Sequence, residues 1–99
     1  MTGRWTFLSH HAHVLLCIAR DPDVRLREVA AEVGITERAV QAIVNDLCAD
    51  GYLTRQRVGR RNHYDVHREL PLRHPLQHEL DVGTLLSMLD PIAPRTHTA

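Results

Sequence analysis

The sequence predicts a mainly α-helical domain with one small β-hairpin, and three observations support this prediction. Between residues 25 and 50, apolar side chains recur at positions i, i+3, i+4 and i+7 in two consecutive stretches separated by Gly34, which is the spacing of two short amphipathic helices. Between residues 51 and 67, apolar and polar residues alternate near a turn that begins at Gly59, which is typical of a hairpin. The chain has 99 residues, which suits a single domain over residues 1–99.

The two helices of residues 25–50 are predicted from their inner faces and their ends. The inner face of the first helix consists of Leu26, Val29, Ala30 and Val33. We expect this helix to end at Gly34, because glycine adopts a left-handed conformation without a Cβ clash. Thr36 can cap the second helix by accepting a hydrogen bond from a free backbone N–H. The inner face of the second helix consists of Val40, Ile43, Val44 and Leu47. Two helices joined by so short a turn form a helix-turn-helix motif.

The outward face of the second helix suggests a binding surface. It carries Glu37, Arg38, Gln41, Ala42 and Asn45. Arginine, glutamine and asparagine side chains can hydrogen-bond to base edges or hold phosphates. For any single one of these residues, an ordinary solvated side chain is the simpler explanation, so the interpretation depends on the segment that comes after the helix.

A basic hairpin follows this helix directly. The predicted hairpin of residues 51–67 contains Arg55, Arg57, Arg60, Arg61 and Asn62. No acidic residue occurs from Gly51 to Tyr64. Over the whole chain, 12 basic and 12 acidic residues cancel, which argues against non-specific coating of nucleic acid. The positive charge is instead gathered on the hairpin and the second helix, and this distribution favours DNA as a partner.

The remaining segments predict contacts with a second copy of the chain. Residues 10–20, capped by Ser9, form a helix that is apolar nearly all round, which indicates burial on more than one side and therefore an inter-subunit surface as well as a core. Trp5 and Phe7 precede it and pack either on a partner or on the edge of their own core. Val24 can add one short strand beside the hairpin.

The C-terminal part is predicted to resume as a helix after a connector. Pro71 and Pro75 interrupt the chain, because proline lacks a backbone donor and restricts the preceding residue. Helical structure is expected from Leu76, and Asp81 can cap a last segment whose apolar residues are Val82, Leu85, Leu86, Met88 and Leu89. The apolar stripe of this dimerisation segment, residues 75–90, is expected to pack on the first helix of a second copy. The predicted dimer interface comprises Trp5, Phe7, Leu15, Ile18, Leu85, Leu86 and Leu89.

The whole arrangement resembles the small winged helix-turn-helix transcriptional regulators of bacteria, of the MarR and ArsR type. The closest stretches are LREVAAEVGITERAVQAIVNDLCADGYL and RVGRRNHY, and the resemblance covers roughly residues 9–89. It implies a sequence-specific regulator of transcription that binds double-stranded DNA as a homodimer. In such regulators the recognition helix, here residues 36–50, enters the major groove, and the wing, here residues 51–67, reaches the backbone or the minor groove.

The resemblance also implies the contact residues. Those at the groove would be Thr36, Arg38, Gln41 and Asn45, and those at the wing Arg57, Arg60, Arg61 and Asn62, with Arg55 on the same hairpin. MarR proteins are usually longer, with extended dimer helices and a ligand cleft between them. A chain of 99 residues has little room for that cleft, and an unidentified effector is left open.

The sequence also allows three alternative functions to be compared with DNA binding. A winged-helix protein–protein interaction module without DNA binding would suit the zero net charge, but four arginines without an acid favour DNA. A metal-sensing ArsR-like repressor would use some of the eight histidines, but zinc needs about three or four ligands and no CxC or CxxC motif occurs; we expect no metal and no cofactor. No nucleophile–base pattern or phosphate-binding glycine loop supports an enzyme. Without a long apolar run or signal peptide, the chain is expected to be cytoplasmic.

Overall fold

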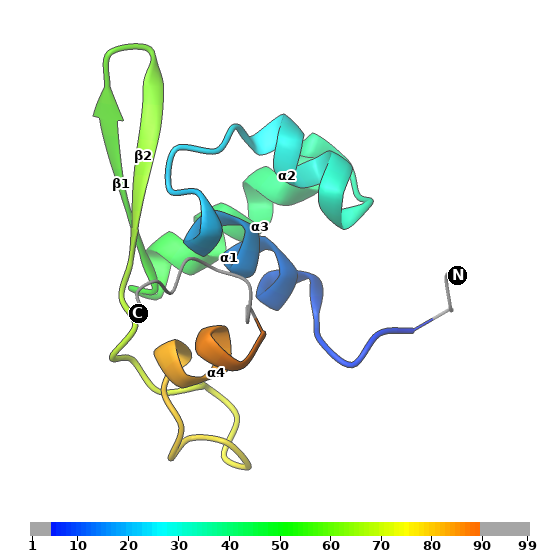
Figure 1. Cartoon of the computed structure of the whole chain (residues 1–99), viewed down its shortest axis with the longest axis vertical. Helices are drawn as coiled ribbons and strands as arrows, with labels where there is room; N and C mark the ends of the chain where they lie inside the picture. The colour runs from blue at the N-terminus through cyan, green and yellow to red at the C-terminus, as the bar shows by residue number, and fades with distance from the viewer. Residues whose placement is uncertain (1–4, 90–99) are drawn as a thin grey trace, which may run out of the picture.

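The computed structural model describes residues 5–89 of the chain. Its elements are α1 (His10–Arg20), α2 (Leu26–Val33), α3 (Glu37–Ala49), β1 (Leu53–Val58), β2 (Arg61–Val66) and α4 (Val82–Leu89). Figure 1 shows α1 near the centre, with α2 and α3 beside it, the hairpin extending away from the helices, and α4 on the other side. The predicted fold class, mainly helical with a small β-hairpin and an additional C-terminal helix, is confirmed, although α4 is short.

The helix-turn-helix forms as its local pattern predicts. The α2 helix ends at Gly34, whose φ of 88° lies in the left-handed region. The hydroxyl of Thr36 accepts a hydrogen bond of 3.0 Å from the backbone N–H of Ala39 and so caps α3. The inner faces of both helices contribute to the core through Val29, Ala30, Val40, Ile43, Val44 and Leu47.

The α1 helix is the centre of the core. It contacts α2, α3, β2 and α4 of the same chain. These contacts explain why its sequence is apolar nearly all round without a second copy. Leu15 and Ile18 were assigned to a dimer interface from the sequence, and that placement is corrected here. Their side chains are 6% and 0% exposed within the single chain, because four elements pack around α1.

The hairpin pairs β1 with β2 in antiparallel register, from Leu53 opposite Val66 to Val58 opposite Arg61. Leu53 and Tyr64 point into the core. The short strand suggested at Val24 does not form, and the described sheet has two strands. The reason is local: the backbone N–H of Val24 donates to the carbonyl of Asp21 at 3.0 Å in a turn, so this donor is not available to a strand.

The C-terminal helix begins at Val82, directly after the cap predicted at Asp81, whereas the helical structure expected from Leu76 does not form. Before it, residues 74–80 form turns, with hydrogen bonds from Gln77 N to His74 O and from Leu80 N to Gln77 O. Asp81 caps the helix by accepting a hydrogen bond of 2.8 Å from Thr84 N, which lowers the pKa of its carboxyl group. The start of α4 is therefore determined by the cap at Asp81 and by the contacts of its first turn with residues 68–70.

The apolar stripe of α4 packs on its own chain. Val82 and Leu86 are 2% and 3% exposed, and α4 contacts α1 of the same chain. Leu86 is therefore a core residue rather than the interface residue predicted from the sequence. Leu85 and Leu89 are half-buried, and residue 90, the predicted end of the dimerisation segment, lies outside the described residues. Among residues 5–89, no helix is long and apolar enough to cross a membrane.

Candidate nucleic-acid interface

The recognition helix α3 exposes a short polar row. Arg38, Gln41 and Asn45 are all exposed. The side-chain amide of Gln41 donates to the Asn45 carbonyl oxygen at 3.1 Å. Because this bond spans one helical turn, it holds the two amide groups in one orientation and leaves further donors and acceptors of both residues free for a partner.

Thr36 stands at the N-terminus of the same helix. Its hydroxyl oxygen already caps Ala39, so its main contribution is to begin the helix at the correct place. The free backbone N–H groups of the first turn and the positive end of the helix dipole favour a phosphate there. Thr36 would then act at the DNA backbone rather than at a base.

The four wing arginines are exposed but are held differently. Arg57 donates from Nε to the carbonyl of Gly59 at 3.0 Å across the turn. Arg61 donates from Nη2 to the carbonyl of Asp23, in the loop between α1 and α2. The guanidinium groups of Arg55 and Arg60 make no hydrogen bond or ion pair with any other described residue. The last two guanidinium groups are therefore the most available for phosphate.

A cleft of about 310 Å³ lies between the wing and the helix-turn-helix. It brings together Gln41 of α3 and Arg60, Arg61 and Asn62 of the wing. The other predicted contact residues are exposed but do not line this cleft; they are Thr36, Arg38, Asn45, Arg55 and Arg57. Two parts of the predicted site, separated in sequence by nearly twenty residues, thus face one hollow.

Arg25 also lines this cleft, and no role was predicted for it from the sequence. It precedes the first residue of α2, where a cation is opposed by the helix dipole. The unfavourable charge at that position is a feature of the sequence from which this residue could have been singled out.

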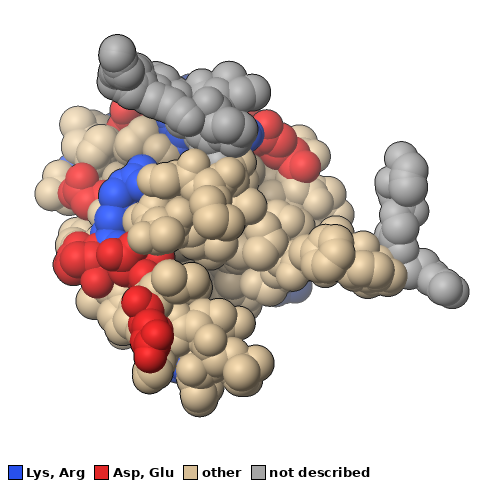
Figure 2. Space-filling view, turned by 60° about the horizontal axis from the view of Figure 1, so that its bottom comes forward, with Lys and Arg blue, Asp and Glu red and all other residues tan. Residues whose placement is uncertain are grey.

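The charge is distributed unevenly over the surface. Figure 2 shows the lower face of Figure 1, which lies away from the hairpin tip, and there acidic side chains are the more prominent charged groups. The basic wing extends from the other end of the molecule. The arginines of the wing and the acidic side chains of the face in Figure 2 thus lie at different ends of the described chain.

The ionisable groups near the wing include one histidine with a shifted pKa. Nδ1 of His63 lies 2.7 Å from Oδ1 of Asp23, and this hydrogen bond raises the pKa of His63 above its ordinary value. Elsewhere, burial raises the pKa of Cys17 to about 11, so this thiol stays protonated and unreactive at neutral pH. No cluster of three or more histidine, cysteine, aspartate or glutamate residues that could hold a metal ion occurs within residues 5–89.

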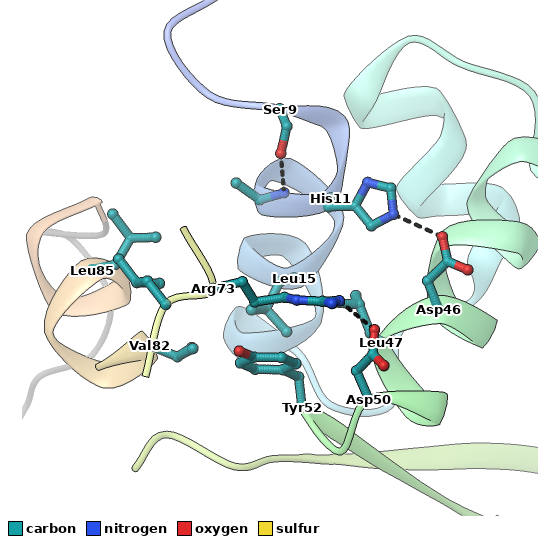
Figure 3. A pocket seen from close by; sticks show the side chains of 12 residues that line it. Ser9, His11, Leu15, Asp46, Leu47, Asp50, Tyr52, Arg73, Val82 and Leu85 are labelled. Atoms are coloured by element: carbon teal, nitrogen blue, oxygen red, sulfur yellow. Dashed lines mark hydrogen bonds and ion pairs between the residues drawn. The ribbon is translucent and has the colours of Figure 1, made fainter. Parts of the chain in front are cut away.

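A second hollow, of about 560 Å³, lies away from the wing. Its walls are mainly apolar and come from Ala12, Leu15, Leu47, Leu72, Val82 and Leu85. Figure 3 shows that two side chains at its edge reach toward α3, where Arg73 meets Asp50 and His11 meets Asp46. The sequence had suggested little room for a ligand cleft. A hollow of this size can enclose a small molecule.

Comparison with known proteins identifies the family. The model of the MarR family matches residues 6–61, a stretch that runs from before α1 to the start of β2. The crystal structure of the PcaV transcriptional regulator from Streptomyces coelicolor, in complex with its natural ligand, is similar with a TM-score of 0.54 and 20% sequence identity, over 100% of this chain and 68% of that chain. At this identity the likeness shows the fold alone. No curated protein matches the chain. Because the family match covers more than half of the chain and includes the complete helix-turn-helix, this protein belongs to the MarR family of winged helix-turn-helix transcriptional regulators and is not an enzyme.

Proposed function

We propose that this protein is a sequence-specific regulator that binds double-stranded DNA as a homodimer, with α3 in the major groove and the wing on the backbone or the adjacent minor groove. The observation that carries the proposal is the cleft that Gln41 of α3 shares with Arg60 and Arg61 of the wing. A side chain that can read a base edge and cations that can hold phosphates lie around one hollow, as recognition of duplex DNA requires.

The two kinds of residue would contribute differently. Arg55 and Arg60, together with the N-terminus of α3 at Thr36, would hold phosphates and supply affinity that falls with salt. Arg38, Gln41 and Asn45 would supply base discrimination. Arg57, Arg61 and Asn62 would shape the wing, because both arginines donate to backbone carbonyls.

The proposal of a homodimer is supported by exposed apolar side chains at the two ends of the described chain. Trp5 and Phe7 are 69% and 92% exposed, and their rings meet edge to face at 5.0 Å. On α4, Met88 is exposed, and Leu85 and Leu89 are half-buried. Apolar surface of this kind is removed from water when two copies associate. Two copies joined in this way would present recognition helices about 34 Å apart, one turn of DNA.

The test combines the mass in solution with duplex binding at two salt concentrations. We expect a dimer, and an affinity that falls steeply with salt. Arg60→Ala should weaken binding to all sequences alike and reduce the slope of log K against log salt by about 1, because one phosphate contact is lost. Arg68→Ala, which removes an exposed arginine outside the wing, is the matched control and should leave the slope unchanged.

A stable monomer would contradict the homodimer. A protein without salt-dependent DNA binding would contradict the regulator and favour the protein–protein interaction module instead. An Arg60→Ala variant with an unchanged slope would mean that the wing does not contact phosphate.

A second function, regulation by a small effector, is favoured by the 560 Å³ pocket. PcaV was crystallised with its natural ligand, but the chemistry of this pocket must come from its own residues. Asp46 and Asp50 at the edge outnumber the single cation Arg73, and each acid already has a partner. We infer that a neutral or cationic molecule with an apolar body fits better than an anion.

Three probes with the same ring separate these classes. Benzyl alcohol and benzylamine are expected to raise the melting temperature, because a ligand that binds only the folded state stabilises it, whereas benzoate should have no such effect. Ala12→Leu places extra atoms in the pocket and should abolish the response. A larger shift with benzoate than with benzylamine would overturn the inferred ligand class.

A further inference from the structure

The wing is fastened to the rest of the molecule at two places. At its base, Tyr52 N donates to Leu47 O at 2.9 Å and Leu53 is buried. Further out, β2 is joined to the loop between α1 and α2, and we call this second attachment the wing joint. It consists of Pro22 and Asp23 on the loop and of Arg61, His63 and Tyr64 on β2.

Three contacts make up the wing joint. Tyr64 N donates to the Pro22 carbonyl at 2.9 Å. Arg61 donates to the Asp23 carbonyl. Nδ1 of His63 lies 2.7 Å from Oδ1 of Asp23. Because Asp23, Arg61 and Tyr64 also line the cleft that contains Gln41, the joint sets where the wing stands relative to α3.

The histidine makes this attachment dependent on protonation. On the other side of the ring, Nε2 of His63 lies 3.5 Å from Oδ1 of Asp65. A neutral imidazole has one N–H and can donate to one carboxylate only, whereas the protonated ring donates from both nitrogens. The two flanking carboxylates therefore favour the charged ring.

Within residues 5–89, Asp23 and Asp65 are the charged groups that shift the pKa of His63. The residue opposite His63 on β1 is the neutral Gln56. The α1 helix also contacts β2, and its buried residues Val14, Leu15 and Ile18 are uncharged. Arg61, on β2, donates to the backbone of Asp23 and strengthens the same attachment. The hydrogen bond to Asp23 is thus the main cause of the raised pKa of His63, and Asp65 raises it further.

We propose that Asp23 and His63 are positioning residues for DNA binding, and that the wing joint is tighter when the His63 ring carries a proton. The proposal rests on the DNA-binding function proposed above. The pKa of His63 is raised in the folded protein. The pair of His63 with Asp23 therefore stabilises the wing joint fully when the pH is below the ordinary pKa of histidine. This stabilisation is lost as the pH rises through the raised pKa of the folded protein. DNA affinity supplied by the wing should therefore be highest below the ordinary histidine pKa and should fall as the pH rises through the raised pKa of His63.

The first measurement uses the free protein and needs no DNA. The amide signal of Tyr64, which donates to Pro22 across the joint, should titrate together with the His63 ring, with a midpoint above the ordinary histidine pKa. In His63→Gln and in Asp23→Asn this titration should disappear. His67→Gln is the matched control, because His67 is also on the wing but pairs with Thr54 instead, and it should keep the titration of Tyr64.

The second measurement compares duplex affinity at about pH 6 and about pH 8 at constant salt. A change of pH also acts on the rest of the protein and on the buffer, so the joint is measured as the difference between wild type and variant. We expect the wild type to gain about two- to fivefold more affinity at low pH than His63→Gln, the range of an exposed ion pair. Asp23→Asn, which keeps the histidine, should lose the same gain, and the double variant should lose no more than either single variant.

The outcomes separate this proposal from the function on which it rests. If Tyr64 does not titrate, or if the two single variants have additive effects, the wing joint is overturned while DNA binding stands. If His67→Gln loses as much of the pH-dependent gain as His63→Gln, charge alone explains the effect and the joint is overturned. If no duplex binds at either pH, the proposed function itself fails, whatever the Tyr64 amide shows.

Discussion

Ile18→Ala is expected to lower the free energy of unfolding by about 2–5 kcal/mol. The Ile18 side chain has no exposed surface and belongs to α1, which contacts α2, α3, β2 and α4. Truncating it removes apolar contacts and leaves a cavity that four separately packed elements cannot all close. A domain of 99 residues has a total stability of about 5–15 kcal/mol, so the loss would be a large part of it.

Chemical denaturation at several protein concentrations measures this effect. Val58→Ala is the control, because Val58 is 59% exposed at the end of β1, away from the proposed dimer contacts, and its truncation should change the stability of the folded chain by about 0.5 kcal/mol or less. The association constant of the folded protein should be the same in wild type and in Ile18→Ala. A variant that keeps its stability but no longer dimerises would reverse the correction and return Ile18 to the subunit interface.

Gln41→Ala is expected to cost about 1–3 kcal/mol of DNA binding at one base pair and to leave the others unaffected. Gln41 is exposed on α3, is oriented by its hydrogen bond to Asn45, and lines the cleft beneath the wing. The loss arises because a bidentate contact to a base edge disappears, and it should relax the preference at that pair. This prediction depends on the proposed sequence-specific function.

Affinities for a selected duplex and for its single-base-pair substitutions would test it. Ala42→Ser is the matched control, since it changes an exposed neighbour on the same helix without removing a base-reading amide. Arg60→Ala provides the contrast, because losing a phosphate contact weakens every duplex alike. If Gln41→Ala also weakens all sequences equally, Gln41 holds the backbone and does not read a base.

The features that could be predicted from the sequence are those encoded locally. Gly34 ends α2 and Thr36 caps α3 because a left-handed turn and a side-chain cap depend on a few neighbouring residues. The i, i+3, i+4, i+7 rows face the core because the helix repeat alone places them on one side. The alternation around Tyr64 likewise identified β2, since one face of the hairpin had to be buried.

The cap of α4 at Asp81 could be predicted locally, but the turns that precede it could not. Leu76 continues an apolar pattern, yet the helix begins at Val82. Val82 N donates to Leu70 O and Gly83 N to Arg68 O, so the position of the helix depends on the connector that precedes it by more than ten residues. A periodic pattern does not record such contacts.

By itself, the sequence determined the class of fold, the helix-turn-helix with its basic wing, and the resemblance to the MarR family. Tertiary structure decided which chain buries each apolar residue: Leu15, Ile18 and Leu86 are all apolar in sequence, but only the packing of four elements around α1 shows that their own chain covers them. It also decided that Arg61 and His63 meet Asp23, 38 and 40 residues away. The physical reason is that propensity, capping and periodicity act over a few residues, whereas burial and side-chain pairing depend on which distant segments the fold brings together.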